Sequence, residues 1–354
     1  MKIAPIYRAS LECNDLDCKI VHTGQHYDHE MSQAFFDELE IPEPAYHLEA
    51  GSGSHAVQTA KIMVSFEKVC EQENPDVVMV VGDVNSTLAC SIVAKKLCTK
   101  VAHVEAGLRS FDLAMPEEIN RMVTDAITDY FFVTEESGVE NLVREGKRQD
   151  RIFFVGHVMI DNLLYQYAKL NNDPGKHFPT SKLKQAYKTY AFLTLHRPSN
   201  VDNRVTFAEI ASALNEIAVE RPIFFPVHPR TRKMIEKFDI KLSDKIIMLP
   251  PLSFSESLYL WKDAEVIMTD SGGIQEETTA LKKPCVTIRE NTERPITLEV
   301  GSNVLAGTKR DNILDAYTAS LEKAKRSIVP EKWDGMASER IWKVLMNDGN
   351  GGIC

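Results

Sequence analysis

Two stretches of the chain decide the fold: VVMVVGD at residues 77–83 and EVIMTDSGG at residues 265–273. Each is a short, continuous apolar run that ends on glycine and polar residues. Runs of this kind, alternating with amphipathic stretches, are typical of parallel strands covered by helices on both faces. Each stretch belongs to its own series of such runs. We therefore predict an α/β protein with two doubly wound parallel-sheet domains.

The domain boundaries follow from the two series of strands. In the first half, strands are expected at residues 19–22, 77–81, 100–104, 130–133 and 152–155. In the second half, they are expected at residues 191–195, 223–227, 245–249, 265–269 and 285–288. The polar segment KLNNDPGKHFPTS is the expected linker. The prediction is an N-terminal domain at 1–168, a C-terminal domain at 169–335, and a helix and tail at 336–354 that can return to the first domain.

Composition excludes several classes of protein. The 354 residues carry a net charge of -10, which argues against broad binding to nucleic acid or to an anionic membrane surface. The chain contains no run of about 18 apolar residues, and its start, MKIAPIYRAS, does not resemble a signal peptide. The seven cysteines form no C-x-x-C pair, and the histidines have no zinc-ligand spacing. We expect a cytoplasmic protein without a metal.

Polar residues follow five of the predicted strands. Because the carboxyl ends of parallel strands meet at one edge of a sheet, we expect these residues to line a cleft where a ligand binds. Taken singly, each could be a helix cap or a buried, hydrogen-bonded core residue. The five groups are Gly82-Asp83, Glu105, His196-Arg197, His228-Pro229-Arg230 and Asp270-Ser271-Gly272-Gly273.

The last of these groups opens a predicted helix. Ser271 is a natural N-cap, and Gly272 and Gly273 let a ligand approach the free backbone N–H groups. A plain helix cap is the alternative, but two glycines favour a diphosphate site. Glu277, one turn further along, could accept hydrogen bonds from a ribose diol or could lie on a solvated helix face.

A second predicted helix start carries acidic residues. Pro116, Glu117 and Glu118 have the ordinary chemistry of a first helical turn. If the fold brings them near Asp83 and Glu105, however, the clustered carboxylates are typical of proton transfer. The chain lacks G-x-G-x-x-G, the P-loop motif and the G-x-S-x-G elbow. Chemistry without a cofactor, on a phosphorylated ligand, remains.

Nine motifs follow one another along the chain: TGQH (23–26), GSGSHAVQT (51–59), GDVNSTLA (82–89), HVEAGLRS (103–110), PEEINR (116–121), LHRPSNVD (195–202), PVHPRT (226–231), TDSGGIQEE (269–277) and NTERP (291–295). These motifs resemble, in order, those of the non-hydrolysing UDP-N-acetylglucosamine 2-epimerases, and their residues are most similar to those of the archaeal branch. The resemblance implies two Rossmann-like domains facing across a cleft in the glycosyltransferase-B arrangement, a homodimer, and UDP-N-acetylglucosamine and UDP-N-acetylmannosamine as ligands.

The resemblance also implies roles for individual residues in elimination and re-addition of UDP through a 2-acetamidoglucal. Asp83 and Glu117 match the proton-transfer pair, Glu105 positions or polarises the sugar, and His196 lies near the diphosphate. The remaining matches are substrate-binding residues: Lys2, Ser271, Gly272, Gly273, Glu277 and Arg294.

Bacterial members have an effector site for UDP-N-acetylglucosamine beside the catalytic site. Val57 stands here where those members have an arginine. The residues that match the effector site are Gln25, His26, Gln58, Arg197 and His228.

The chain departs from the family at its start. Family members begin with an apolar strand followed by G-T-R-P-E-A-I-K-x-A-P, whereas this sequence begins at the lysine of that motif, with Met1-Lys2-Ile3-Ala4-Pro5. We therefore expect the first strand and its phosphate-binding arginine to be missing, which would leave the strand at 19–22 without a central neighbour.

Three other functions stay open at this point. A hydrolysing epimerase would use the same site and release UDP and N-acetylmannosamine. A glycosyltransferase could share the architecture, although the three carboxylate motifs count against it. A catalytically impaired UDP-sugar binding protein would follow from the missing strand. Product analysis with and without an acceptor separates these alternatives from the epimerase.

Overall fold

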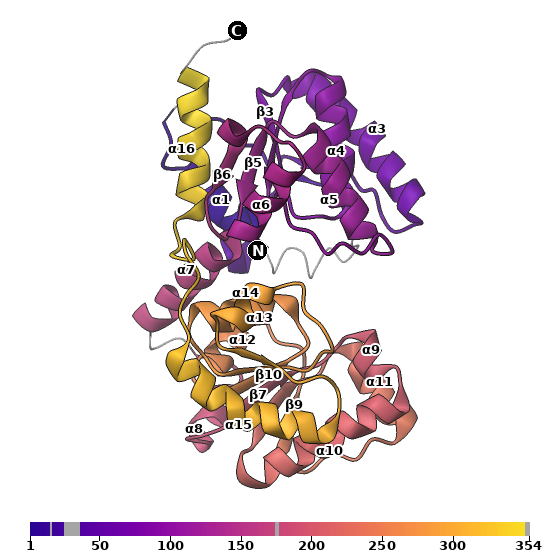
Figure 1. Ribbon diagram of the computed structural model, residues 1–354, viewed down its shortest axis with the longest axis vertical. Coiled ribbons are helices and arrows are strands. Elements are labelled where there is room, and N and C mark those ends of the chain that lie inside the picture. The colour runs from indigo at the N-terminus through magenta and orange to yellow at the C-terminus, as the bar shows by residue number, and fades with distance from the viewer. Residues whose placement is uncertain (15, 25–35, 174–176, 351–354) are drawn as a thin grey trace. The chain divides into compact units, whose positions relative to one another are not determined.

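The structure is a computed structural model that describes residues 1–14, 16–24, 36–173 and 177–350. The chain forms two compact units (Figure 1). Unit 1 comprises Met1–Asn162 and Glu331–Cys354, and unit 2 comprises Leu163–Pro330. The chain passes from unit 1 to unit 2 inside helix α7 (Val158–Asn172), six residues before the expected boundary at 168/169.

Unit 1 is built on parallel strands. A four-stranded sheet has the order β3-β4-β5-β6, and a separate two-stranded sheet pairs β1 with β2. The strands are β1 (Val21–His22), β2 (Tyr46–His47), β3 (Val77–Val81), β4 (Lys100–Val104), β5 (Tyr130–Val133) and β6 (Ile152–Phe154). The helices are α1 (Ile3–Ser10), α3 (His55–Glu73), α4 (Asn85–Lys96), α5 (Pro116–Ile127), α6 (Glu136–Arg144) and α16 (Ala337–Asn350), with a 3-10 turn η1 (Gln149–Arg151).

The two ends of the chain pack against each other in unit 1. Helix α16 packs against α1, and the Trp342 indole N–H donates to the carbonyl of Ile6 at 2.8 Å. The carboxylate of Asp161 accepts hydrogen bonds from the backbone N–H groups of Ala337 and Ser338, at the start of α16. These anchors satisfy donors that a helix start otherwise leaves unpaired, and so they hold α16 on unit 1.

Unit 2 contains one six-stranded parallel sheet with the order β12-β11-β10-β7-β8-β9. Strands β7, β8 and β9 follow one another toward one edge of the sheet, and β10, β11 and β12 follow one another toward the other edge. The strand order therefore reverses between β7 and β10. The strands are β7 (Ala191–Thr194), β8 (Ile223–Pro226), β9 (Ile246–Leu249), β10 (Val266–Thr269), β11 (Cys285–Thr287) and β12 (Asn303–Leu305). The other helices are α8 (Ser181–Ala186), α9 (Pro198–Val201), α10 (Arg204–Glu220), α11 (Pro229–Phe238), α12 (Phe254–Trp261), α13 (Gly272–Ala280), α14 (Pro295–Glu299) and α15 (Arg310–Arg326).

The predicted α/β class with parallel sheets is confirmed, and every predicted strand is present. Two strands were not predicted, β2 with two residues and β12 with three. Both are too short to show a hydrophobic pattern of their own, and they are defined only by pairing with β1 and β11. The first strand of unit 1 is shorter than expected, since only its last two residues pair.

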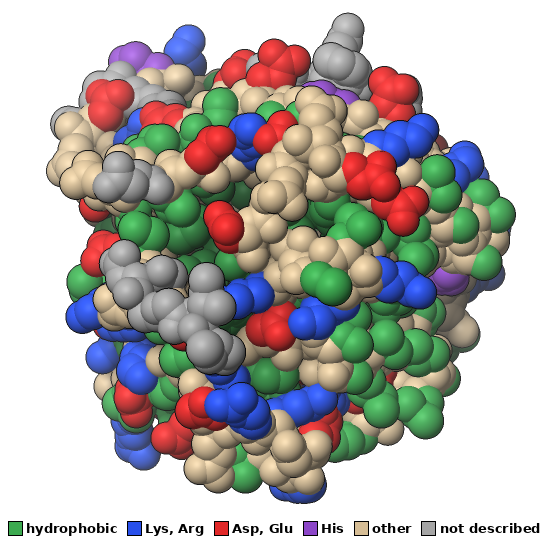
Figure 2. All heavy atoms as spheres, turned by 90° about the horizontal axis from the view of Figure 1, so that it is seen from above, with side chains coloured by type: hydrophobic (Ala, Val, Ile, Leu, Met, Phe, Trp, Pro, Cys, Tyr) green, Lys and Arg blue, Asp and Glu red, His purple; other side chains and the backbone are tan. Residues whose placement is uncertain are grey.

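The surface carries charges of both signs. Acidic and basic side chains are interspersed over the face drawn in Figure 2, with hydrophobic patches between them. None of the helices within the described part of the chain is long and apolar enough to span a membrane.

Candidate functional site

The turns after β3 and β4 bring three predicted site residues together. Glu105 has a φ of 73°, rare for a residue with a side chain, and its carboxylate accepts from the Lys2 ammonium at 2.6 Å. Gly82 has a φ of 75°, and a Cβ placed there would lie 3.2 Å from Lys2 Nζ. A glycine is therefore needed where the lysine crosses the turn toward Glu105.

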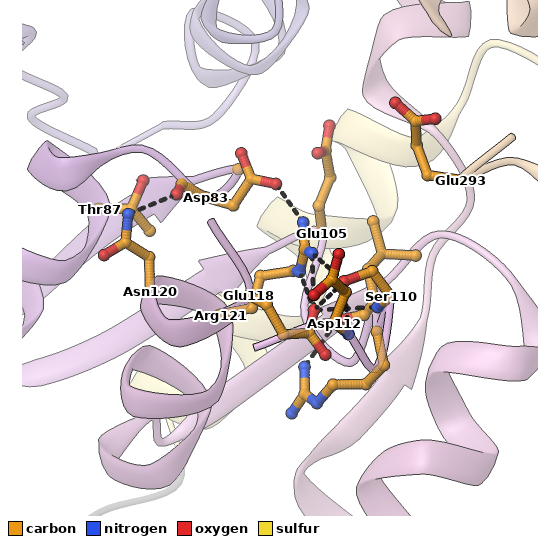
Figure 3. A network of polar contacts seen from close by, with 12 residues as sticks. Asp83, Thr87, Glu105, Ser110, Asp112, Glu118, Asn120, Arg121 and Glu293 are labelled. Atoms are coloured by element: carbon orange, nitrogen blue, oxygen red, sulfur yellow. Dashed lines mark hydrogen bonds and ion pairs between the residues drawn. The ribbon is translucent and has the colours of Figure 1, made fainter. Parts of the chain in front are cut away.

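The first two turns of α5 lie against the Asp83 turn (Figure 3). Asn120 donates to the backbone carbonyl of Asp83 at 2.8 Å, and Arg121 Nη1 donates to Asp83 Oδ2 at 2.5 Å. Glu117 is partly exposed in the first turn, and among the described residues it has no hydrogen bond or ion pair. Its carboxylate is thus free for chemistry in a way that those of Asp83 and Glu105 are not.

Glu118, which the sequence only grouped with Glu117 as an acid of the first helical turn, is a buried anchor. Its carboxylate accepts from the backbone N–H of Ser110 at 2.9 Å, from that of Phe111 at 3.0 Å and from Arg121 Nη2 at 2.6 Å. Burial acts to raise the pKa of Glu118, but these donors outweigh it and the pKa falls below its ordinary value. In sequence it is indistinguishable from Glu117, because both are acids in a first helical turn.

A second buried network of hydrogen bonds and ion pairs holds the turns after β3 and β4. His103 Nδ1 lies 2.7 Å from Asp125 Oδ1, and its Nε2 lies 2.9 Å from the carbonyl of Gly82. Asp125 also accepts from the backbone N–H of Gly107 at 3.0 Å and pairs with Arg109 at 2.8 Å. Burial lowers the pKa of His103, but Asp125 more than compensates and the pKa rises. The only signal in sequence was a histidine inside an apolar strand, which is usually a core residue.

In unit 2, Asp270 organises the point where the strand order reverses. Its carboxylate follows β10 and accepts from the backbone N–H groups of His196 and Arg197, which follow β7, at 2.9 and 2.8 Å. The His196 ring lies 3.0 Å from Asp270 through Nδ1 and stays partly exposed. Neighbouring strand ends thus place His196 and Ser271 at the switch point, as the topology requires.

The two predicted effector residues of unit 2 lie at this same edge. Arg197 donates to the backbone carbonyl of Asp270 and to the carboxylate of Glu293, each at 3.0 Å. The rings of His196 and His228 lie 5.8 Å apart. Burial, followed by the charge of His196, lowers the pKa of His228. His228 is therefore biased toward the neutral ring when no anion is near.

Helix α13 begins as predicted, with Ser271 at the N-cap. The Ser271 side chain makes no capping hydrogen bond. A Cβ on Gly272 would meet only Glu293 Oε1, at 3.7 Å, so the approach to the first turn is open. The N–H groups of this turn are left without a side-chain cap, which suits an anion.

Glu277 and Arg294 both interact with Glu276. Glu277 is 4% exposed, and burial, followed by the charge of Glu276, raises its pKa to about 8. The Arg294 guanidinium pairs with Glu276 at 2.5 Å. Arg294, which the resemblance places at UDP, is therefore held by a buried carboxylate on α13.

Of the remaining predicted residues, Gln58 is linked through Asn85 to Asn120, which holds the Asp83 turn. Gln58, on α3, donates to the carbonyl of Gly51 at 3.0 Å and accepts from Asn85 at 2.8 Å, at the start of α4. Gln25 and His26 lie outside the described residues. No group of histidine, cysteine and acidic side chains that could hold a metal ion occurs in residues 1–14, 16–24, 36–173 and 177–350.

The fold and the site together define a class: a two-unit, parallel-sheet α/β protein with clustered carboxylates in one unit and, in the other, a helix start without a side-chain cap at the point where the strand order reverses. The sequence profile of the UDP-N-acetylglucosamine 2-epimerase family matches residues 9–346, and the chain belongs to that family. The resemblance seen in the ordered motifs is thereby confirmed.

Individual relatives match over almost their whole length. The UDP-N-acetylglucosamine 2-epimerase of Methanocaldococcus jannaschii is 44% identical over 353 residues, which cover 98% of this chain and 95% of the relative. The crystal structure of that species' enzyme in complex with UDP-GlcNAc and UDP has a TM-score of 0.85 at 43% identity, covering 98% and 96% of the two chains. The UDP-2,3-diacetamido-2,3-dideoxy-D-glucuronate 2-epimerase of Pseudomonas aeruginosa is 38% identical over 348 residues, or 98% and 96% of the two chains.

Proposed function

We propose that this protein interconverts UDP-N-acetylglucosamine and UDP-N-acetylmannosamine without hydrolysis. The observation that carries the proposal is the match to the Methanocaldococcus jannaschii enzyme, which spans 98% of this chain and whose solved structure holds UDP-GlcNAc and UDP. The predicted catalytic carboxylates of unit 1 support it, since Asp83 and Glu105 follow the neighbouring strands β3 and β4 and Glu117 lies in the first turn of α5, which packs against β4.

The proposed reaction inverts C2 of the sugar, a carbon with no adjacent carbonyl to acidify its hydrogen. The C1–O bond breaks and its electron pair leaves with UDP, while a carboxylate takes the C2 proton and a C1=C2 double bond forms. UDP then adds back to C1, and an acid delivers a proton to the other face of C2. This sequence needs two proton-transfer groups and a site that retains both fragments.

The proposed roles in unit 1 rest on the match to the family motifs, and the contacts support them. Asp83 and Glu117 form the proton-transfer pair: one is held by Arg121, and the other has no partner among the described residues. Glu105, paired with Lys2, positions the sugar.

The proposed roles in unit 2 concern the nucleotide. The open first turn of α13, at Ser271, Gly272 and Gly273, accepts the diphosphate, and His196 assists the departure of UDP. Glu277 accepts hydrogen bonds from the ribose, and Arg294 contacts UDP while Glu276 holds it.

The match to the Pseudomonas aeruginosa enzyme supports a second candidate substrate, a diacetamido uronic acid linked to UDP. The chemistry at C2 would be the same. The candidates differ at C3 and C6, so a comparison of kcat/KM for the two UDP-sugars decides between them.

Incubation with UDP-N-acetylglucosamine in heavy water tests the main proposal. We expect NMR to show UDP-N-acetylmannosamine with deuterium at C2 of both sugars, because the solvent-derived proton enters whenever the glycal is reprotonated. A product without deuterium, or no conversion of UDP-N-acetylglucosamine, would contradict the proposal.

The same reaction mixture separates the open alternatives. Free N-acetylmannosamine and UDP would identify a hydrolysing enzyme, and a product seen only with an added acceptor would identify a glycosyltransferase. Binding without turnover would identify a sugar-nucleotide binding protein. A sigmoidal dependence of rate on UDP-N-acetylglucosamine would support the effector site, for which Gln58, Arg197 and His228 are the described candidates.

We also propose that the protein is a cytoplasmic homodimer. The cysteines Cys13, Cys18, Cys70, Cys90, Cys98 and Cys285 are free thiols, which suits a reducing compartment. The apolar side chains of Ile119, Met122 and Val123 are exposed on one face of α5. An exposed apolar stripe of this kind is typical of a protein interface.

The dimer is tested with Met122→Lys, which places a charge in the middle of the stripe. We expect light scattering to give about twice the chain mass for the wild type and a shift toward 39.9 kDa for the variant. Val219→Lys, at an exposed position on α10, serves as the matched control. A wild type that is monomeric at micromolar concentration would contradict the proposal.

A further inference from the structure

Arg121 bridges two carboxylates that lie far apart in sequence. Nη1 donates to Asp83 Oδ2 at 2.5 Å, while Nε and Nη2 donate to Glu118 Oε2 at 3.0 and 2.6 Å. Figure 3 shows the guanidinium between the two acids. The arginine side chain is 10% exposed, and the Glu118 side chain is 1% exposed. The bridge is therefore a fixed, largely buried feature rather than a surface ion pair.

The Asp83 side chain depends on this bridge for its orientation. Asn120 fixes only the backbone carbonyl of Asp83, and within the described part of the chain no other cationic side chain pairs with its carboxylate. Oδ1 has no hydrogen-bond partner among the described residues and is left for the substrate. Holding one oxygen and leaving the other open restricts the carboxylate to one direction.

The other end of the bridge holds a loop. Glu118 accepts from Ser110 and Phe111, so Arg121 links the Asp83 turn to the segment that precedes α5. An arginine suits this place because its planar fork reaches two acids at once in fixed geometry, whereas a lysine has a single flexible ammonium.

We propose that Arg121 is a positioning residue for catalysis, which aims the Asp83 carboxylate at the sugar and ties it to the loop at 110–115 through Glu118. The inference rests on the proposed epimerase function. It assigns Arg121 no contact with the substrate. Its effect is exerted through Asp83, and loss of the fork should therefore reduce kcat much more than it raises KM.

The test is a double-mutant cycle between Arg121→Lys and Asp83→Asn, followed by deuterium incorporation at C2. A misplacement of the reacting group by about 1 Å costs about 100-fold in rate. We therefore expect Arg121→Lys to lower kcat by about that factor with KM changed less than about threefold. In the Asp83→Asn background, the same change should alter the residual rate by less than about twofold, because its target is gone.

Two further variants guard against trivial results. Removing Arg121 alone leaves Glu118 buried and unpaired, so the charge-neutral double variant Arg121→Gln/Glu118→Gln is used to separate misfolding from mispositioning. We expect it to fold, by circular dichroism, and to lose activity like Arg121→Lys. Arg148→Lys, in an exposed pair with Asp150, is the matched control and should keep the wild-type rate.

The outcomes separate the two claims. Equal losses from Arg121→Lys in both backgrounds, or full activity of any folded Arg121 variant, would overturn the positioning role. A wild type that shows no conversion of UDP-N-acetylglucosamine would instead refute the proposed function itself.

Discussion

Glu117→Gln is expected to lower kcat for epimerisation by about 10²- to 10⁴-fold, the range for loss of a general acid or base. Glutamine keeps the size of the side chain but cannot carry the proton. The free energy of unfolding should stay within about 0.5 kcal/mol, because Glu117 has no hydrogen bond or ion pair with the described residues. Steady-state kinetics and urea unfolding of the same preparation measure both quantities.

The control for this change is Glu136→Gln. Glu136 is also an acid in a first helical turn, that of α6, and is exposed. It should leave both rate and stability unchanged. If Glu117→Gln lost stability but kept kcat, Glu117 would be an ordinary helix-start residue and the proposed proton-transfer pair would be wrong.

Glu277→Gln is expected to stabilise the protein at neutral and alkaline pH while weakening its nucleotide binding. Burial raises the folded-state pKa of Glu277 to about 8 from an ordinary value of 4.5. The folded state therefore keeps a proton that the unfolded state releases. The associated stability is fully present below pH 4.5 and is lost as the pH rises through about 8.

The variant avoids this loss because its amide does not ionise. We expect the free energy of unfolding of Glu277→Gln to match that of the wild type near about pH 4 and to exceed it by about 4 kcal/mol near about pH 7.5. Urea unfolding across this range measures the difference. Isothermal calorimetry with UDP above about pH 8, where the wild-type Glu277 is ionised, should show weaker binding by the variant, since an amide accepts fewer hydrogen bonds from the ribose diol than a carboxylate does.

The matched control is Glu299→Gln, an exposed acid in α14 of the same unit. It should show no pH-dependent gain. A constant difference between Glu277→Gln and the wild type from about pH 4 to about pH 9 would contradict the raised pKa. Unchanged affinity for UDP would contradict the proposed contact with the ribose.

Part of the site could be predicted because some of its residues stand at positions that the local sequence identifies. Asp83 and Glu105 directly follow apolar strands, and a polar residue at such a place is visible without knowing the fold. Glu118 and Arg121 carry no such mark. Acidic residues and arginines on a helix have the same spacing in the sequence whether they form buried ion pairs or face solvent.

The sequence by itself determined the strands other than β2 and β12, the parallel α/β class and the helix start at Ser271–Gly273, because short-range hydrophobic patterning and capping chemistry are local properties of the chain. Only the tertiary structure decided which charges pair. Arg121 and Asp83 are 38 residues apart, and His196 and Asp270 are 74 apart. Such contacts arise from the order of strands in each sheet. The strand order depends on how all the strands and helices of a domain pack together, and it cannot be read from any short stretch of the sequence.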